Sequence, residues 1–324
     1  FNEFCRTDVL KYSNIWVDMF KRIGRWVDFN NDYKTMNLPF MESVISNFKQ
    51  LYDKGLVYED YRVLPSSWAA ETPLSNFEVN QGYQDKTDNA ITVLFKLENG
   101  QKILVWTTTP WTLPSNTALC VGNKIDYVAV QTYNPYTAEP VTVVLAKERL
   151  SAYLQADGAE LPMDSYKQGD KVIPYRVIAE YKGADLVGMH YEQLFPWVKP
   201  VFKDTDGSIR ISEDGFRVIH GDYVTTEDGT GIVHIAPTFG ADDAFVAKAA
   251  GIPSLFMVNK KMETRPMVDF PGKYWLPEEL DADFVENCID KELYAEFAGA
   301  YVKNAYDPKF NVDGKYDEAA AQKS

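Results

Sequence analysis

The chain has 324 residues, of which 45% are hydrophobic and 14% aromatic, so it can bury a large core. No apolar run is long enough to cross a bilayer. The net charge of −14 argues against general nucleic-acid binding, although a pocket for one nucleotide end depends on local charge and is not excluded. The three cysteines and three histidines are scattered without disulfide-scaffold or zinc spacing, so we expect a cytoplasmic location and no metal.

Residues 1–62 are expected to be helical. Apolar residues there repeat at intervals of three and four ahead of a glycine stop, namely Met41, Val44, Ile45, Phe48 and Leu51, with Gly55 following. We expect these residues, together with Trp16, Phe20 and Trp26, to pack in a core.

From about residue 90 the pattern indicates strands. Residues 91–97 and 102–106 flank the hairpin signal Asn99-Gly100, and residues 127–132 and 141–146 flank the turn signal at 134–135. Further strands are expected at 170–179, 216–224 and 232–236, and helices at 147–154, 241–250 and 278–300. The polar tail from residue 308 is expected to be partly disordered. This order of expected helices and strands predicts a mixed α/β (α+β) chain with a strand-rich centre.

One segment whose residues could form a binding or catalytic site is 106–116. It reads WTTTPWTLPSN and directly follows an expected strand. Its two prolines turn the chain out of a sheet. Four threonines, Thr107, Thr108, Thr109 and Thr112, fall within six residues, and each hydroxyl can donate and accept a hydrogen bond. Such a cluster suits sugar hydroxyls, an ester carbonyl and a water molecule. Alternatively, these threonines simply fill a strand and cap turns.

A second segment, 229–243, reads GTGIVHIAPTFGADD: a glycine turn, an apolar strand, a loop and a helix start. Asp242 and Asp243 fall in the first helical turn, where a carboxylate can cap the helix and favour its dipole. A carboxylate that points into a pocket could instead bind an ammonium group, which is the functional interpretation of Asp243. His234 is either a core residue of the apolar strand or part of a site.

Together the two segments resemble the signature segments of the inserted editing domain (CP1) of isoleucyl-tRNA synthetase, a class I enzyme. The valyl and leucyl relatives tend to have arginine where Thr109 stands and an acidic residue near Trp111. The resemblance extends through 23–28, 71–79, 182–189 and 221–228, and so covers almost the whole chain. It implies a piece of a longer enzyme.

The resemblance implies three parts. Residues 1–62 would be a helical segment of an incomplete synthetic (Rossmann-type) domain, 63–307 a barrel-like, strand-rich editing domain with flanking helices, and 308–324 the polar tail. Because the synthetic domain is incomplete, the aromatic residues of 1–62 could alternatively lack their partners or mediate dimer contacts.

The resemblance also assigns site residues. Asp243 would hold the α-ammonium group of the substrate, and His234 would wall the amino-acid pocket against a larger side chain. The implied catalytic set is Asp243, Thr108 and Thr109, and the implied substrate-binding set is Trp106, Thr107, Trp111, Thr112, His234 and Asp242. The tryptophans would stack on adenine or close the pocket.

The implied reaction is hydrolysis of the ester of valyl-tRNA(Ile), by water attack without a covalent intermediate. Isoleucine and valine differ by one methylene, so a single binding step discriminates by roughly 10- to 200-fold, a limit for which isoleucyl-tRNA synthetase is itself the standard example. A second site that admits valine and excludes isoleucine removes the error.

The implied partners are the valine-bearing 3′ acceptor end of tRNA(Ile) and the missing catalytic and anticodon-binding domains. The family's ATP-binding motifs, of His-Ile-Gly-His and Lys-Met-Ser-Lys-Ser type, do not occur here, so ATP and magnesium are expected only for a full-length synthetase. Residues 66–70 lack the zinc-binding cysteines of many relatives. Two alternatives stay open: an acceptor-end binding module that is inactive without the rest of the enzyme, and an editing domain of the valyl or leucyl type.

Overall fold

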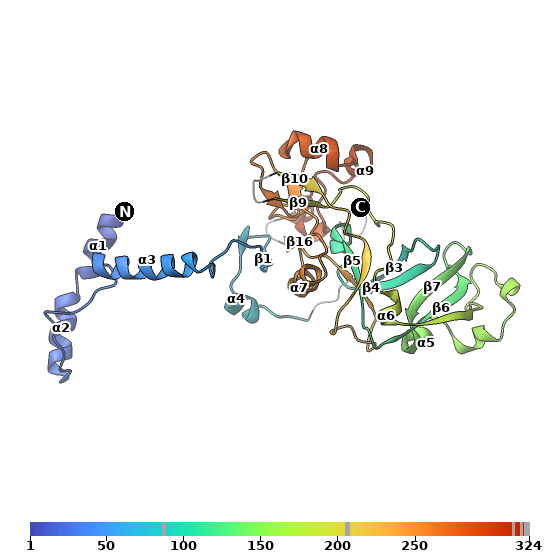
Figure 1. The fold of residues 1–324 in the computed structure, drawn as a ribbon, viewed down its shortest axis with the longest axis horizontal. Coiled ribbons are helices and arrows are strands. Elements are labelled where there is room, and N and C mark those ends of the chain that lie inside the picture. The colour runs from blue at the N-terminus through green and yellow to red at the C-terminus, as the bar shows by residue number, and fades with distance from the viewer. Residues whose placement is uncertain (86–88, 205–207, 313–314, 318–319, 321–324) are drawn as a thin grey trace. The chain divides into compact units, whose positions relative to one another are not determined.

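The computed structural model describes residues 1–85, 89–204, 208–312, 315–317 and 320. The chain divides into two compact units, Phe1–Tyr61 (unit 1) and Arg62–Ser324 (unit 2) (Figure 1). Among the described helices, none combines the length and the apolar character that crossing a membrane requires.

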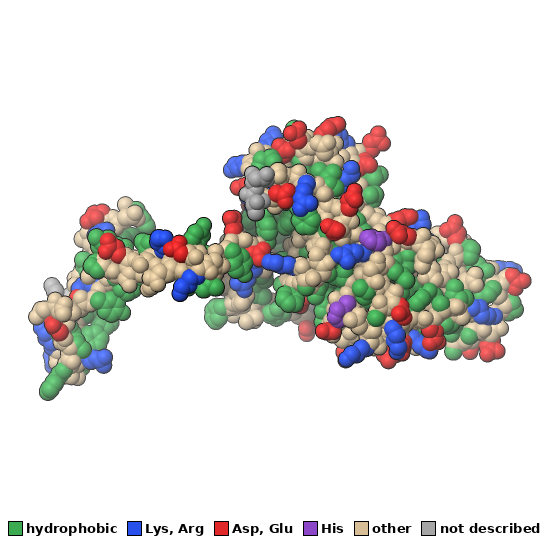
Figure 2. Space-filling view, viewed as in Figure 1, with side chains coloured by type: hydrophobic (Ala, Val, Ile, Leu, Met, Phe, Trp, Pro, Cys, Tyr) green, Lys and Arg blue, Asp and Glu red, His purple; other side chains and the backbone are tan. Residues whose placement is uncertain are grey.

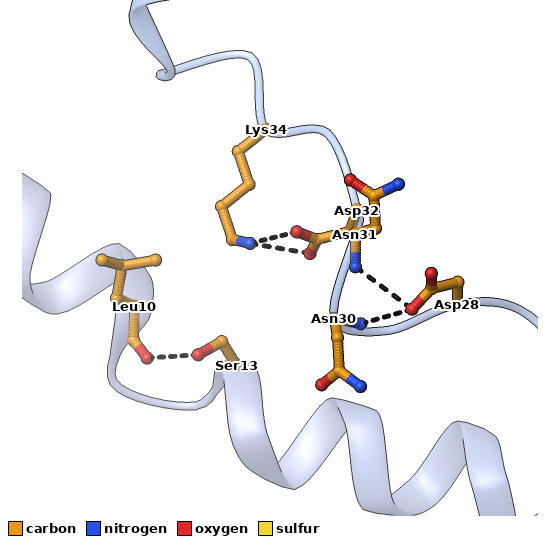
Figure 3. Close-up of polar contacts among 7 residues, drawn as sticks. All are labelled: Leu10, Ser13, Asp28, Asn30, Asn31, Asp32 and Lys34. Atoms are coloured by element: carbon orange, nitrogen blue, oxygen red, sulfur yellow. Dashed lines mark hydrogen bonds and ion pairs between the residues drawn. The ribbon is translucent and has the colours of Figure 1, made fainter.

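Unit 1 is helical, as expected, and contains α1 (Asn2–Leu10), α2 (Ser13–Arg22) and α3 (Leu38–Asp53). Short-range polar contacts shape its connections (Figure 3). The Ser13 hydroxyl donates to the carbonyl of Leu10 (2.9 Å) between the first two helices. In the loop before α3, Asp28 Oδ1 accepts from the backbone N–H groups of Asn30 (2.9 Å) and Asn31 (3.2 Å). These are turn bonds that the local sequence can make without distant partners.

The expectation of core packing in unit 1 is wrong. The five apolar residues of α3 are 41–67% exposed, Trp16 is 55% exposed and Trp26 is 95% exposed. Phe20 is half-buried and stacks on Trp16, with ring centroids 5.7 Å apart. Figure 2 shows hydrophobic side chains over the surface of this unit. The physical reason is size: about 60 residues in three helices can bury only a small core by themselves.

The main sheet of unit 2 has five strands in the order β3-β4-β7-β6-β8. Figure 1 labels β3, β4, β6 and β7 of this sheet. Its members are β3 (Ile91–Lys96), β4 (Lys102–Thr107), β6 (Asp126–Tyr133), β7 (Pro140–Ala146) and β8 (Arg176–Lys182). The two expected hairpins are present: β3 pairs antiparallel with β4 across Asn99-Gly100, and β6 pairs antiparallel with β7. Only the β4–β7 pair within this sheet is parallel.

A second sheet has three strands in the order β11-β5-β12, formed by β5 (Ala118–Val121), β11 (Arg217–His220) and β12 (Ile232–Ile235). The central strand β5 pairs parallel with β11 and antiparallel with β12. The inward side chains of both sheets form one hydrophobic cluster, which includes Val105, Leu119, Tyr127 and Ile232. Because this core joins the two sheets, it also fixes the end of β4 against β5 and β12.

The remaining strands of unit 2 form two-stranded pairs: β1 (Ser66–Ser67) with β2 (Thr72–Pro73), β9 (Val201–Lys203) with β10 (Ile209–Ile211), β13 (Met257–Val258) with β14 (Thr264–Arg265), and β15 (Asn311–Val312) with β16 (Lys315–Tyr316). The helices are α4 (Asn76–Gln81), α5 (Leu150–Tyr153), α6 (Gly183–Leu186), α7 (Ala241–Ala249), α8 (Ala282–Cys288) and α9 (Lys291–Ala295). A second core, centred on Trp197 stacked over Phe297 at 4.0 Å, lies under α8 and α9.

The mixed α/β class is confirmed, but the described strands form several open sheets and no closed barrel. The strand expected at 170–179 is displaced to β8, whose position is set by pairing with β6. The helix expected at 278–300 is two short helices, since Asp290 caps a new start with bonds from Glu292 and Leu293. Partial disorder was expected for the tail from residue 308. The described residues there include the β15–β16 pair and a buried Phe310, and residues 313–314, 318–319 and 321–324 lie outside the described residues.

Candidate functional site

The two segments singled out in the sequence line one cavity of about 390 Å³ in unit 2. The first segment contributes Trp106, Thr107, Thr108, Thr109, Trp111 and Thr112, and the second contributes Val233, His234, Ala236, Phe239, Gly240 and Asp243. All the predicted site residues except Asp242 therefore meet here, although the segments are more than a hundred residues apart in sequence.

Strand pairing brings the segments together. The first segment leaves the sheet at the end of β4, turns through a 3-10 helix (Pro110–Ser115) and enters β5, whose Leu119 lies opposite His234 of β12. Asn116 stabilises the pairing of β5 with β12, because its side-chain amide donates to the carbonyls of Ala118 (2.8 Å) and Ile235 (3.4 Å). The Tyr191 hydroxyl in turn donates to Asn116 Oδ1 (2.6 Å). Neither β5 nor this role of Asn116 is predicted from the sequence, because both depend on long-range pairing.

The threonines form a small hydroxyl network. The backbone N–H of Thr109 donates to Thr107 Oγ1 (3.0 Å), and the hydroxyls of these two residues lie 3.3 Å apart. Thr112 donates its hydroxyl proton to the carbonyl of Thr109 (2.9 Å). Thr107 and Thr112 are buried, whereas Thr108 and Thr109 are exposed. The buried pair thus holds the turn, and the exposed pair presents hydroxyls at the cavity.

His234 is a neutral imidazole in contact with this network. Its Nε2 lies 3.2 Å from the hydroxyl oxygen of Thr112. Because Thr112 gives its own proton to a carbonyl, the imidazole donates through Nε2–H, and Nδ1 carries the lone pair. Nδ1 is buried without a hydrogen-bond partner among the described residues. Burial lowers the pKa of His234 to about 4, so the ring is uncharged at neutral pH.

The Thr112–His234 contact is a hydroxyl–imidazole pair that sequence reasoning missed. It is not an activated nucleophile. The imidazole donates rather than accepts, its pKa makes it a weak base, and no third group orients its other nitrogen among the described residues. The pair therefore shapes a wall of the cavity, which favours water over a side chain as the attacking group.

Asp243 supplies the negative charge of the cavity. It lies in the first turn of α7, and its Oδ2 accepts a hydrogen bond from the backbone N–H of Ala236 (2.9 Å). Burial raises the pKa of Asp243; the Ala236 bond opposes this and the charge of Asp242 adds to it. Gly240 makes room for the carboxylate, since a Cβ there would lie 2.6 Å from Asp243 Cγ.

Asp242 does not line the cavity, so the structure does not bring it together with the other residues of the predicted substrate-binding set. Its side chain is exposed. One residue along an α-helix is a rotation of about 100°, so adjacent carboxylates cannot both face the same wall. Asp242 remains well placed to interact with the dipole of α7.

Three aromatic rings border the cavity. Trp111 and Phe239 meet edge to face, with centroids 4.9 Å apart, and Phe239 is a lining residue that the sequence analysis did not select. Trp106 lies against Gly229, where a Cβ would approach its ring to 2.9 Å. Rings of this kind provide flat apolar surfaces on which a base or an aliphatic side chain can rest.

Comparison with known proteins adds a family relationship. The family described as tRNA synthetases class I (I, L, M and V) matches residues 1–296. The isoleucine–tRNA ligase of Bacteroides thetaiotaomicron is 58% identical over 99% of this chain, and that of Porphyromonas gingivalis is 48% identical over 95%. The chain spans 29% and 27% of the lengths of these relatives.

Solved structures match more weakly. The Plasmodium knowlesi cytosolic leucyl-tRNA synthetase editing domain is 13% identical over 51% of this chain and 63% of its own, with a TM-score of 0.33. That score is too low for the likeness to say anything about function.

Proposed function

The chain belongs to the class I tRNA synthetases, and from this premise we propose that its unit 2 hydrolyses the ester bond of a mischarged tRNA, releasing valine from valyl-tRNA(Ile). The observation that carries the proposal is the cavity in which a carboxylate, a threonine network and three aromatic rings converge from two distant segments. Because the chain spans less than a third of the relatives' length, the ligation reaction of a whole synthetase is not assigned to it.

The cavity supports binding of a single aminoacyl-adenosine end. Its volume of about 390 Å³ is within the range of small-molecule sites. The Asp243 carboxylate is the acceptor for an α-ammonium group, and a charge-assisted bond of this kind is short and strong. Positive charge on the substrate also offsets the cost of burying that carboxylate, so the site gains most from a ligand that carries an amine.

The chemistry we propose is attack of water on the ester carbonyl carbon, which expels the ribose hydroxyl and frees the amino acid. The exposed hydroxyls of Thr108 and Thr109 hold the water and the carbonyl oxygen, where negative charge develops. Thr107 and Thr112 keep the turn in place through the bonds described above. No covalent enzyme intermediate is needed.

Selectivity would come from the wall that His234 forms beside Thr112. A neutral, buried imidazole held by a hydrogen bond is a rigid limit to the depth of the cavity. Valine fits short of that wall, and the additional methylene of isoleucine does not. The result is exclusion of the correct product, the opposite preference to that of a synthetic site.

Figure 2 shows acidic and basic side chains interspersed over the visible face of unit 2, without a broad basic surface. With a net charge of −14, the chain should bind the body of a tRNA weakly and depend on the acceptor end. We therefore propose the tRNA 3′ end and the remaining domains of a synthetase as its partners.

The deciding experiment is deacylation of valyl-tRNA(Ile) and isoleucyl-tRNA(Ile) by the 324-residue chain, with a short valyl-RNA mimic of the acceptor end as a third substrate. The proposal expects hydrolysis of the valyl ester in both forms and protection of the isoleucyl ester. Binding without hydrolysis would identify an acceptor-end binding module instead. Hydrolysis of another amino-acid ester in preference to valine would indicate an editing domain of the valyl or leucyl type.

A further inference from the structure

Arg149 lies outside the cavity, yet it holds the loop 226–231 that supports one cavity wall. It ends a 3-10 turn (Lys147–Arg149) that follows β7 and is half-buried. Its Nε donates to the carbonyl of Gly229 (2.9 Å) and its Nη1 to the carbonyl of Glu227 (3.0 Å). The planar guanidinium therefore spans two carbonyls of the same loop with donors in a fixed geometry, which a flexible ammonium group does not provide.

Further hydrogen bonds from neighbouring residues also hold the loop 226–231. Glu148 accepts a hydrogen bond from the Thr226 hydroxyl, and the backbone N–H of Ala146 donates to the carbonyl of Thr230 (2.9 Å). At the far end of the loop, the buried Tyr127 hydroxyl donates to the carbonyl of Gly231 (2.7 Å). The loop is thus bound along its length to β6, β7 and the turn after β7, and it leads directly into β12.

The same loop also supports Trp106. Gly229 (φ +65°) and Gly231 (φ +74°) both adopt backbone conformations that favour glycine. A Cβ on Gly229 would lie 2.9 Å from Trp106 Cε3, and a Cβ on Gly231 would lie 2.5 Å from that of Ala146. The backbone of Gly229 is therefore the surface against which the indole ring rests, and the carbonyl of this same residue accepts from Arg149.

We propose that Arg149 is a positioning residue that sets the orientation of Trp106, and through it the shape of the substrate cavity. Its guanidinium fixes the carbonyls of the loop, the loop fixes the plane beneath the indole, and the indole faces the cavity. The consequence for substrate rests on the proposed hydrolytic function, whereas the link between Arg149 and Trp106 does not. Displacement of a cavity wall by an ångström is enough to lower a rate by up to about a hundredfold.

The link can be tested without activity. The chain has seven tryptophans, so incorporation of 5-fluorotryptophan gives up to seven ¹⁹F NMR lines, and Trp106→Phe identifies the line of interest. Arg149→Met should shift or broaden that line in a folded protein. The matched control is Arg176→Met, because Arg176 is also half-buried and also donates to two carbonyls, those of Tyr175 (2.6 Å) and Leu161 (2.7 Å), away from the cavity. The control should leave the Trp106 line in place.

Valyl-tRNA(Ile) deacylation supplies the functional readout. Arg149→Met should lower kcat/KM about tenfold, mainly through a higher KM, whereas Arg176→Met should stay within about twofold. In a Trp106→Phe background the same Arg149 substitution should cost less than about twofold, because residues that act through one another are not additive. Equal losses in the two backgrounds would overturn the proposed route through Trp106.

An unmoved Trp106 line in folded Arg149→Met would overturn the inference whatever the activity. If Arg149→Met does not fold, the ¹⁹F line of Trp106 is measured instead in Arg149→Gln, which keeps one hydrogen-bond donor for the loop. A wild-type chain that leaves valyl-tRNA intact would instead refute the proposed function, and the ¹⁹F lines would still decide the role of Arg149.

Discussion

Replacing Asp243 with asparagine should separate activity from stability. Asparagine has nearly the same shape, and its Oδ1 can still accept the hydrogen bond from the N–H of Ala236. The substitution therefore removes the charge of the cavity while the backbone connection to α7 is kept. Alanine would remove both, which would confuse loss of a ligand contact with local unfolding.

The expected loss of activity follows from the contact that disappears. A hydrogen bond to a charged group contributes about 1.5–3 kcal/mol. At about 1.4 kcal/mol for each factor of ten, kcat/KM for valyl-tRNA should fall by about ten- to a hundredfold. The matched control is Asp242→Asn, which makes the same change of charge one residue earlier on an exposed part of the same helix. It should change kcat/KM by less than about twofold.

Stability should change in the other direction. Burial raises the pKa of Asp243, so the folded chain binds this proton more readily than the unfolded chain does. The stabilising contribution of this group is complete below the unfolded pKa and is lost as the pH rises through the higher folded pKa. At pH 7 the ionised carboxylate therefore costs stability, and Asp243→Asn should melt no lower than wild type. Its advantage should shrink as the pH is lowered through the titration of the carboxyl group.

Deacylation kinetics and thermal unfolding at pH 7 and pH 4 measure both effects on the same samples. Unchanged hydrolysis by Asp243→Asn would remove this carboxylate from the site. Equal losses of activity in the two asparagine variants would show that the net charge of α7 matters rather than the position of one carboxylate. A variant that melts well below wild type at pH 7 would contradict the pKa argument.

Three further substitutions address other parts of the site. His234→Ala should open the cavity to isoleucyl-tRNA in a deacylation assay, and continued protection of the isoleucyl ester would contradict the size filter. Because burial lowers the pKa of His234 from its usual 6.5 to about 4, wild type should lose up to about 3 kcal/mol of stability as the pH falls from 6.5 to 4, and His234→Ala should not show this loss. Gly229→Ala should lower the free energy of unfolding by about 1–3 kcal/mol in a thermal unfolding experiment, and by more than Gly100→Ala does. Gly100 has a similar positive φ but open space beside it, where Gly229 has Trp106. Equal effects of the two substitutions would exclude the steric contribution of the ring. Thr109→Val should lower kcat about tenfold with little change in KM, as expected for a hydroxyl that acts on water; a change in KM alone would assign it to binding.

Local signals predicted much of unit 2. The Asn99-Gly100 turn and the alternation on each side of it place β3 and β4 within one residue of their observed ends, and the glycine has the positive φ that the hairpin needs. The helix of Asp243 was also predicted, because the loop before it and the acidic first turn are local features. Where pairing between distant strands decides the structure, prediction failed: β5 was missed and β8 was misplaced.

The sequence by itself determined which residue types the site has, since the threonines and the carboxylate occur in two short segments that can be read directly. Only the tertiary structure decided how they are used. The pairing of β5 with β12 places His234 against Thr112, the rotation of α7 turns Asp243 inward and Asp242 outward, and the loop held by Arg149 supports Trp106. The first and third of these outcomes depend on contacts between residues far apart in the chain, and a short stretch of sequence does not contain the free energy of such contacts. For the same reason, the helices of unit 1 were predictable from their periodicity, whereas the exposure of their apolar faces was not.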